Sequence, residues 1–124
     1  MEVKRKFTRV EFKMKALVQL DNVMIVKANI LNISLKGAFF ELADYCLFQI
    51  GDKWQLKFIL PNSDMSLQFN TEVVHSRKKL VGVKFYHIDI DTMIHLRSLI
   101  EGRTSNPLQV EKEIESLYDW EKPT

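Results

Sequence analysis

Apolar and polar residues alternate along four separate segments of the chain. A repeat of two places successive side chains on opposite faces of a strand, whereas a helix would scatter them around its axis. Two further segments have a more mixed pattern but are rich in β-forming residues. The six expected strands cover, in order, residues 10–20, 23–30, 38–42, 54–60, 65–73 and 81–85.

Turn signals separate these segments at short intervals. Asp21 and Asn22 follow the first segment, PNSD at residues 61–64 follows the fourth, and a basic turn at residues 77–79 follows the fifth. Many short strands joined by turns are typical of an antiparallel barrel or sandwich. We therefore expect a mainly β fold built from six antiparallel strands.

The repeat changes near residue 89, where helical spacing begins. Asp89 or Asp91 can cap the start of a helix, and Gly102 is placed to end it. Asn106 and Pro107 then mark the start of a second helix. Its expected apolar stripe comprises Val110, Ile114, Leu117 and Tyr118. We expect residues 1–102 to form the barrel with its basic N-terminal arm and first helix, and residues 103–124 to form a helical extension.

Length and composition limit the cellular context. A chain of 124 residues suffices for one domain with its own core. The single cysteine, Cys46, cannot form an internal disulfide, which favours a cytoplasmic location. The N-terminal residues include no apolar run of the kind that a secretory signal requires. No apolar stretch approaches the roughly 20 residues of a spanning helix, so we expect no membrane insertion.

The sequence offers little support for enzyme chemistry. The three histidines have no spacing that places two of them on one metal ion: His75, His87 and His95. Ser34 does not lie in a strand-turn-helix nucleophile motif, and Asp89 and Asp91 are accounted for by helix capping. We expect no catalytic residue, no metal site and no cofactor, and hence not an enzyme.

Two short motifs carry the strongest functional signal. The first is RKFTR, which places Arg5 and Arg9 in a basic arm ahead of the first strand. The second is NISLKG, which places Asn32, Ser34 and Gly37 in the expected connection between the second and third strands. Each motif alone is ordinary, because arginines are common in basic arms and Asn, Ser and Gly are common in loops. Their joint occurrence in this order is not ordinary.

In these motifs the sequence resembles the PilZ family, bacterial receptors for the second messenger cyclic di-GMP. The family is marked by RxxxR ahead of the first strand and by [D/N]xSxxG after the second, and both motifs are complete here. GAFFEL and VGVKF also fit the family pattern. The resemblance covers roughly residues 4–100 and implies a six-stranded antiparallel β-barrel followed by a helix.

The resemblance implies that Arg5, Arg9, Asn32, Ser34 and Gly37 bind cyclic di-GMP. A guanidinium is planar and donates in a fixed fork, so it can pair with guanine O6 and N7, stack on the base or grip a phosphate. The side chains of Asn32 and Ser34 would hydrogen-bond guanine edges or a phosphate. Gly37 would permit a positive φ or a close backbone approach. Possible secondary contacts to the phosphates come from three lysines: Lys4, Lys6 and Lys36.

A receptor of this kind transmits a signal, so we expect a downstream protein partner. The second helix could contact that partner, pack on the barrel or form a homodimer. One alternative is a PilZ-like interaction module that does not bind the nucleotide. Another is a small barrel that binds single-stranded nucleic acid through aromatic platforms. Trp54, Phe58 and Phe69 fall at alternating apolar positions and are expected in the core, so we predict no DNA partner.

Overall fold

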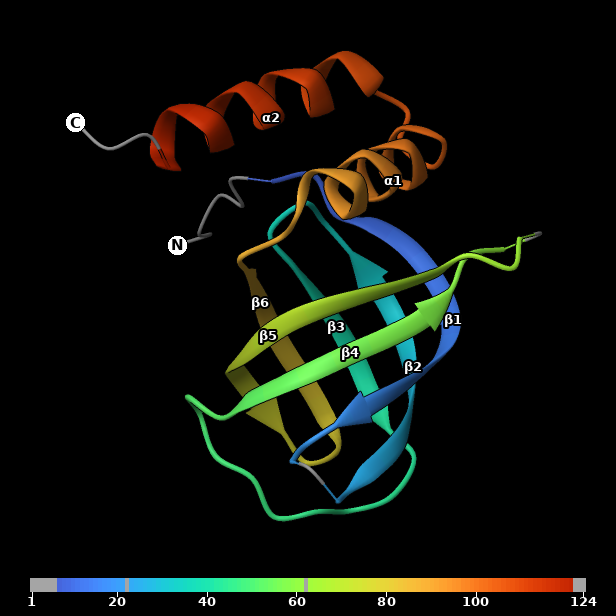
Figure 1. Cartoon of the computed structure of the whole chain (residues 1–124), viewed down its shortest axis with the longest axis vertical. Helices are drawn as coiled ribbons and strands as arrows, with labels where there is room; N and C mark the ends of the chain where they lie inside the picture. Colours follow the sequence, from blue (N-terminus) through green and yellow to red (C-terminus); the bar gives the residue numbers. More distant parts are fainter. Residues whose placement is uncertain (1–6, 22, 62, 122–124) are drawn as a thin grey trace.

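The computed structural model describes residues 7–21, 23–61 and 63–121, with the surroundings of side chains described as far as residue 114. Six antiparallel strands form a closed barrel, and two helices follow (Figure 1). The elements are β1 Val10–Gln19, β2 Ile25–Ile33, β3 Gly37–Leu42, β4 Lys53–Ile59, β5 Ser66–Arg77, β6 Leu80–Tyr86, α1 Ile90–Glu101 and α2 Pro107–Glu121. The expected mainly β fold with two C-terminal helices is confirmed.

The barrel closes because its first and fourth strands pair. The strands neighbour one another in the order β1-β2-β3-β6-β5-β4, and Val18 of β1 lies opposite Leu56 of β4. Closure pairs every strand on both sides and so removes the unpaired edges that an open sheet or sandwich would retain. Of the two architectures that the alternation permits, the chain adopts the barrel.

The alternating apolar residues fill the barrel interior. Trp54, Phe58 and Phe69 are 3%, 2% and 1% exposed, which confirms their expected place in the core. The ring of Phe69 stacks on that of Phe85 with centroids 4.3 Å apart. These rings are therefore enclosed by the barrel and cannot serve as an exposed platform for nucleic-acid bases.

The first connection shifts the start of the second strand from its expected position. The carboxylate of Asp21 accepts hydrogen bonds from the backbone N–H groups of Val23 and Met24, both at 2.8 Å. This turn holds Val23 outside the ladder, so β2 runs from Ile25 to Ile33 rather than over residues 23–30. At its other end, β2 extends past residue 30 because Asn32 pairs with Glu11 of β1 and with Phe39 of β3, so Asn32 lies on a strand and not, as expected, in the connection that follows it.

The helix boundaries follow the capping signals. The carboxylate of Asp89 accepts a hydrogen bond from the N–H of Thr92 at 2.7 Å, and Gly102 ends α1. Asn106 precedes α2, which begins at Pro107. The predicted caps at Asp89, Gly102 and Asn106 are confirmed. Neither helix has the length and apolar character needed to span a bilayer within the described part of the chain.

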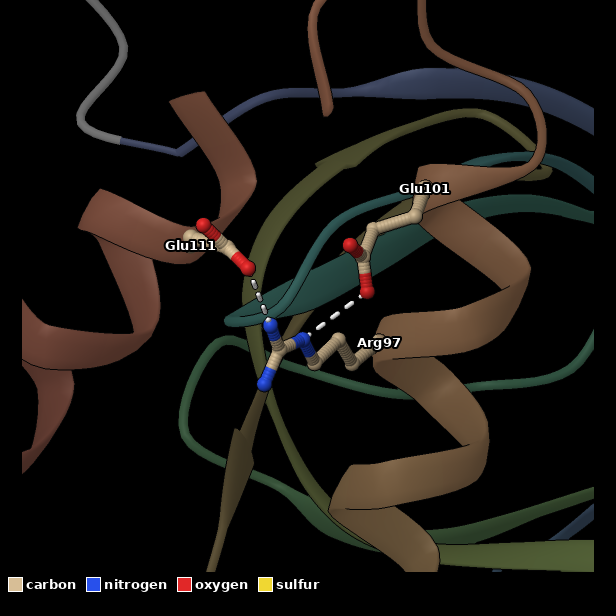
Figure 2. Close-up of polar contacts among 3 residues, drawn as sticks. All are labelled: Arg97, Glu101 and Glu111. Atoms are coloured by element: carbon tan, nitrogen blue, oxygen red, sulfur yellow. Dashed lines mark hydrogen bonds and ion pairs between the residues drawn. The ribbon is translucent and has the colours of Figure 1, made fainter. Parts of the chain in front are cut away.

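Helix α2 lies across α1 at one end of the barrel (Figure 1). Figure 2 shows the polar link between them: Arg97 of α1 donates to Glu101 at 2.8 Å and to Glu111 of α2 at 3.0 Å. Val110 and Ile114 are buried in the core cluster, as the predicted stripe requires. The side chains of Leu117 and Tyr118 lie outside those whose surroundings are described.

Candidate functional site

Pairing of β1 with β2 brings the two motifs together. Glu11 lies opposite Asn32 in the register, so Arg9, two residues earlier, is a diagonal neighbour of Asn32 on the same face. The Nη1 of Arg9 donates a hydrogen bond to Oδ1 of Asn32 at 2.9 Å. One residue from each motif therefore meets the other directly, although 23 positions separate them in sequence.

A cavity of about 380 Å³ opens beside this contact. Its volume falls within the range of small-molecule sites, which are typically about 300–1,000 Å³. Four of its residues form one continuous row across the sheet, since Asn32 lies opposite Phe39, Phe39 opposite Gly82, and Gly82 opposite His75. The complete lining is Arg9, Asn32, Ala38, Phe39, Val74, His75, Gly82 and Val83.

Sequence reasoning did not identify Phe39, His75 and Gly82 as members of this site. The signal for Phe39 was present, because it is a half-buried aromatic between Ala38 and Phe40, which are 1% and 0% exposed. His75 and Gly82 depend on pairing that the sequence does not reveal. A Cβ at position 82 would lie 3.2 Å from Cβ of His75 and 3.6 Å from the ring of Phe39, so glycine keeps this part of the cavity open.

Ser34 shapes the turn between β2 and β3. Its side chain is buried, and its Oγ accepts hydrogen bonds from the N–H groups of Lys36 and Gly37, both at 3.2 Å. The backbone N–H of Ser34 also donates to the carbonyl of Gly37 at 2.8 Å. These bonds fix the turn that joins β2 to β3. A direct contact between Ser34 and a ligand stays a prediction.

Gly37 is the first residue of β3 and lies against the backbone of β6. A Cβ added at this position would be 2.1 Å from the carbonyl oxygen of Val83, a separation that real side chains do not show. Gly51 is the glycine with a positive φ among those described, so Gly37 has an ordinary backbone conformation. Of the two reasons expected for this glycine, close backbone approach applies, and the neighbour is the protein's own β6.

Of the remaining predicted basic contacts, only Lys36 belongs to the described residues. Lys36 is half-buried in the turn, and its carbonyl accepts a hydrogen bond from the N–H of Phe85 at 2.7 Å, which ties the turn to β6. Arg5, Lys4 and Lys6 lie outside the described residues. Their contacts with a ligand stay predictions, as does that of Lys36.

The potential metal ligands, the Cys46 thiol and the Asp89 carboxylate show no sign of a second functional site within the described residues. No group of three or more potential metal ligands occurs among the residues that the structure describes. Burial, with a smaller effect of the Asp52 carboxylate, raises the pKa of the Cys46 thiol, which disfavours the reactive thiolate. The backbone N–H of Thr92 lowers the pKa of Asp89, as expected for a capping carboxylate.

A larger cavity, of about 700 Å³, lies against β1, β2 and β4. Met14, Ala16, Ala28 and Phe58 contribute to its mainly apolar lining. It contains no residue of either motif. The smaller cavity combines a guanidinium, an amide and an aromatic ring, and is therefore the better candidate for a polar planar ligand.

Comparison with known proteins bears on the resemblance to the PilZ family that the two motifs indicate. The chain is similar in structure to the PilZ domain of YcgR from Escherichia coli solved with c-di-GMP, with a TM-score of 0.69, 12% identity and coverage of 94% of this chain and 98% of that one. It is also similar to the PilZ domain of CeSA from a cellulose-synthesizing bacterium, with a TM-score of 0.64, 12% identity and coverage of 77% and 96%.

The Bacillus subtilis inhibitor of motility MotI/DgrA gives a TM-score of 0.65 and 17% identity over 95% of this chain and 53% of that one. No curated protein sequence gives a significant match. The family model for the PilZ domain matches residues 3–102, which is most of the chain and ends at Gly102, the residue that caps α1. The chain belongs to the PilZ domain family.

Proposed function

We propose that the protein is a cyclic di-GMP receptor whose ligand occupies the cavity beside Arg9 and Asn32. The observation that carries the proposal is the direct contact of these two residues, one from each motif, at the edge of a cavity of suitable volume. Membership of the PilZ family and the likeness to a YcgR domain solved with c-di-GMP support the same ligand.

The chemistry of the cavity suits a guanine nucleotide. Arg9 is exposed and carries the donor fork that pairs with guanine O6 and N7. Asn32 offers a carbonyl and an amide to a base edge, and Phe39 offers an aromatic surface on which a base can stack. Arg5, and secondarily Lys4, Lys6 and Lys36, would add cations for the two phosphates. Ser34 and Gly37 would hold the turn in a shape that presents Asn32.

The proposed role is transmission rather than catalysis. Binding would change the surface at the arm and the β2–β3 turn, and a downstream protein partner would recognise that change. Because cyclic di-GMP is a bacterial second messenger, we place the protein in the bacterial cytoplasm. A homodimer stays a prediction for the signalling assembly.

Calorimetry with cyclic di-GMP and cyclic di-AMP tests the proposed ligand. We expect cyclic di-GMP to bind and cyclic di-AMP to bind about tenfold more weakly or worse, because adenine has an amino group where guanine presents the O6 acceptor. The two ligands share their charge and backbone, so the comparison isolates recognition of the base.

The alternatives predict different calorimetric results when single-stranded oligonucleotides are titrated beside the two cyclic dinucleotides. Absence of heat with cyclic di-GMP would favour a PilZ-like interaction module that does not bind the nucleotide. Salt-dependent binding of single-stranded oligonucleotides with no preference for the cyclic dinucleotide would favour a nucleic-acid-binding barrel. Equal binding of both cyclic dinucleotides would show that charge alone drives association.

A further inference from the structure

Helix α2 contributes a buried carboxylate to the end of the barrel where the first motif lies. Glu113 is 4% exposed and is the one charged side chain among the described residues that is buried. Burial of a carboxylate is costly unless hydrogen-bond donors replace the lost water. Such a group therefore marks a place where the structure supplies specific donors.

Thr8 supplies those donors. Its backbone N–H donates to Oε1 of Glu113 at 2.7 Å, and its hydroxyl donates to Oε2 at 2.5 Å. Hydrogen bonds to an ionised acceptor are shorter and stronger than neutral ones. The contact joins residues 105 positions apart, so it ties the C-terminal helix to the segment that enters β1. In Figure 1 this segment passes between α2 and the barrel.

Thr8 lies inside the RxxxR motif, next to Arg9. On one side of it Phe7 packs against the core cluster, and on the other Arg9 donates to Asn32 at 2.9 Å. Fixing the backbone of Thr8 limits the directions that Arg9 can take, because the two residues share a peptide bond. The carboxylate of Glu113 therefore acts on the position of a proposed ligand contact without touching the cavity.

We propose that Glu113 is a positioning residue for the cyclic di-GMP site and that the docking of α2 is coupled to ligand binding. The inference rests on the proposed function and extends it to a helix beyond the PilZ family match, which ends at residue 102. By holding Thr8, α2 keeps Arg9 beside Asn32 before the ligand arrives. Pre-organisation of this kind raises affinity because less ordering is left for the binding step.

Coupling between two sites is reciprocal, so the ligand should in turn stabilise the docking of α2. The described attachment of α2 is small: the Thr8 bonds, the buried side chains Val110 and Ile114, and the partly exposed ion pair of Glu111 with Arg97. Exposed ion pairs contribute little to stability. Loss of the Thr8 contact should therefore noticeably lower the stability of α2 docking on the barrel.

Three variants of α2 test this coupling in the full chain. Glu113→Ala removes both acceptors, and we expect cyclic di-GMP affinity to fall about fivefold or more. Glu113→Gln keeps an acceptor for the N–H of Thr8, and its amide can donate to the threonine hydroxyl, so we expect affinity within about twofold of wild type. Lys112→Ala, at the exposed neighbouring position, is the matched control and should leave affinity unchanged.

Hydrogen exchange provides the readout that a purely structural residue would not alter. In the wild type, cyclic di-GMP should slow exchange at the amides of residues 110–114, and in Glu113→Ala that slowing should disappear. Without ligand, the amide of Thr8 should exchange faster in Glu113→Ala than in Glu113→Gln. If Glu113→Ala fails to fold, Thr8→Val, which removes only the hydroxyl bond, should weaken binding in the same direction.

The outcomes separate this inference from the proposed function. A wild-type protein that binds no cyclic di-GMP would overturn both. Wild-type binding together with equal affinity in folded Glu113→Ala would overturn the positioning role alone. Ligand-induced protection of α2 that persists in Glu113→Ala would likewise show that the helix responds by a route other than Thr8.

Discussion

Replacing Arg9 by alanine should weaken cyclic di-GMP binding about tenfold or more, while the free energy of unfolding changes little. The loss of one charged bidentate contact typically costs on the order of 1.5–3 kcal/mol, and each 1.4 kcal/mol corresponds to about tenfold in affinity. Stability should be nearly unaffected because Arg9 is exposed and its bond to Asn32 lies at the surface. Calorimetry and thermal unfolding of the same sample measure the two effects.

Two further substitutions show whether the fork or the charge matters. Arg9→Lys keeps the positive charge but loses the paired donors, so it should resemble Arg9→Ala more than the wild type. Lys13→Ala removes a charge from an exposed position of β1, the strand that Arg9 directly precedes, and should have little effect. If Arg9→Lys binds like the wild type, or if Lys13→Ala is equally harmful, the affinity comes from general positive charge rather than recognition by Arg9.

Gly37→Ala should destabilise the fold by about 2 kcal/mol or more, because the new methyl group cannot avoid the backbone of β6. Its Cβ would lie 2.1 Å from the carbonyl oxygen of Val83, and a main-chain carbonyl of a strand that is paired on both sides cannot rotate away as a side chain could. β3 and β6 must separate to relieve the overlap. Urea unfolding of the variant and the wild type measures the difference.

Gly102→Ala is the matched control for that experiment. Gly102 has helical backbone angles, and its nearest would-be neighbour is the carbonyl oxygen of Ser98 at 3.4 Å, an ordinary contact. The same change of glycine to alanine should therefore be neutral or slightly stabilising there. A Gly37→Ala protein that is as stable as the wild type but binds the ligand more weakly would contradict the packing role. It would indicate instead that Gly37 acts in ligand binding.

Local features of the sequence account for most of the fold. Alternation of apolar residues and enrichment in β-forming residues are properties of each strand alone, so the two signals together predict six strands without knowledge of their partners. The caps at Asp89 and Asn106 are equally local, because each acceptor and its donor lie within one turn. Barrel closure between β1 and β4 is not local, and the alternation alone left a sandwich open.

The site was predictable only in part for the same reason. Arg9 and Asn32 belong to recognisable motifs, whereas Gly82 and His75 join the cavity through the pairing of β6 with β5. Asn32 lies on β2 rather than in the expected connection because it pairs with Glu11 of β1 and with Phe39 of β3, partners that its own segment does not reveal. A pairing register cannot be read from one strand, so the row that runs from Asn32 to His75 appears only in the folded chain.

For Glu113, helical periodicity predicts the face of α2 on which the residue lies but not the partner that it contacts. It follows Val110 by three residues, which places both on one face of α2, and the two are indeed buried together. A glutamate at such a position ordinarily predicts an exposed helix face. Its burial depends on donors from Thr8, at the opposite end of the chain, and no local pattern indicates that partner.

The most direct test of the central claim is a titration of ¹⁵N-labelled protein with cyclic di-GMP, followed by the chemical shifts of its backbone amides. We predict that the largest changes lie at Arg9 and along the row of Asn32, Phe39, Gly82 and His75, where the cavity is placed. Large changes confined instead to the cavity beside Met14 and Lys57, or no changes at saturating ligand, would contradict the account.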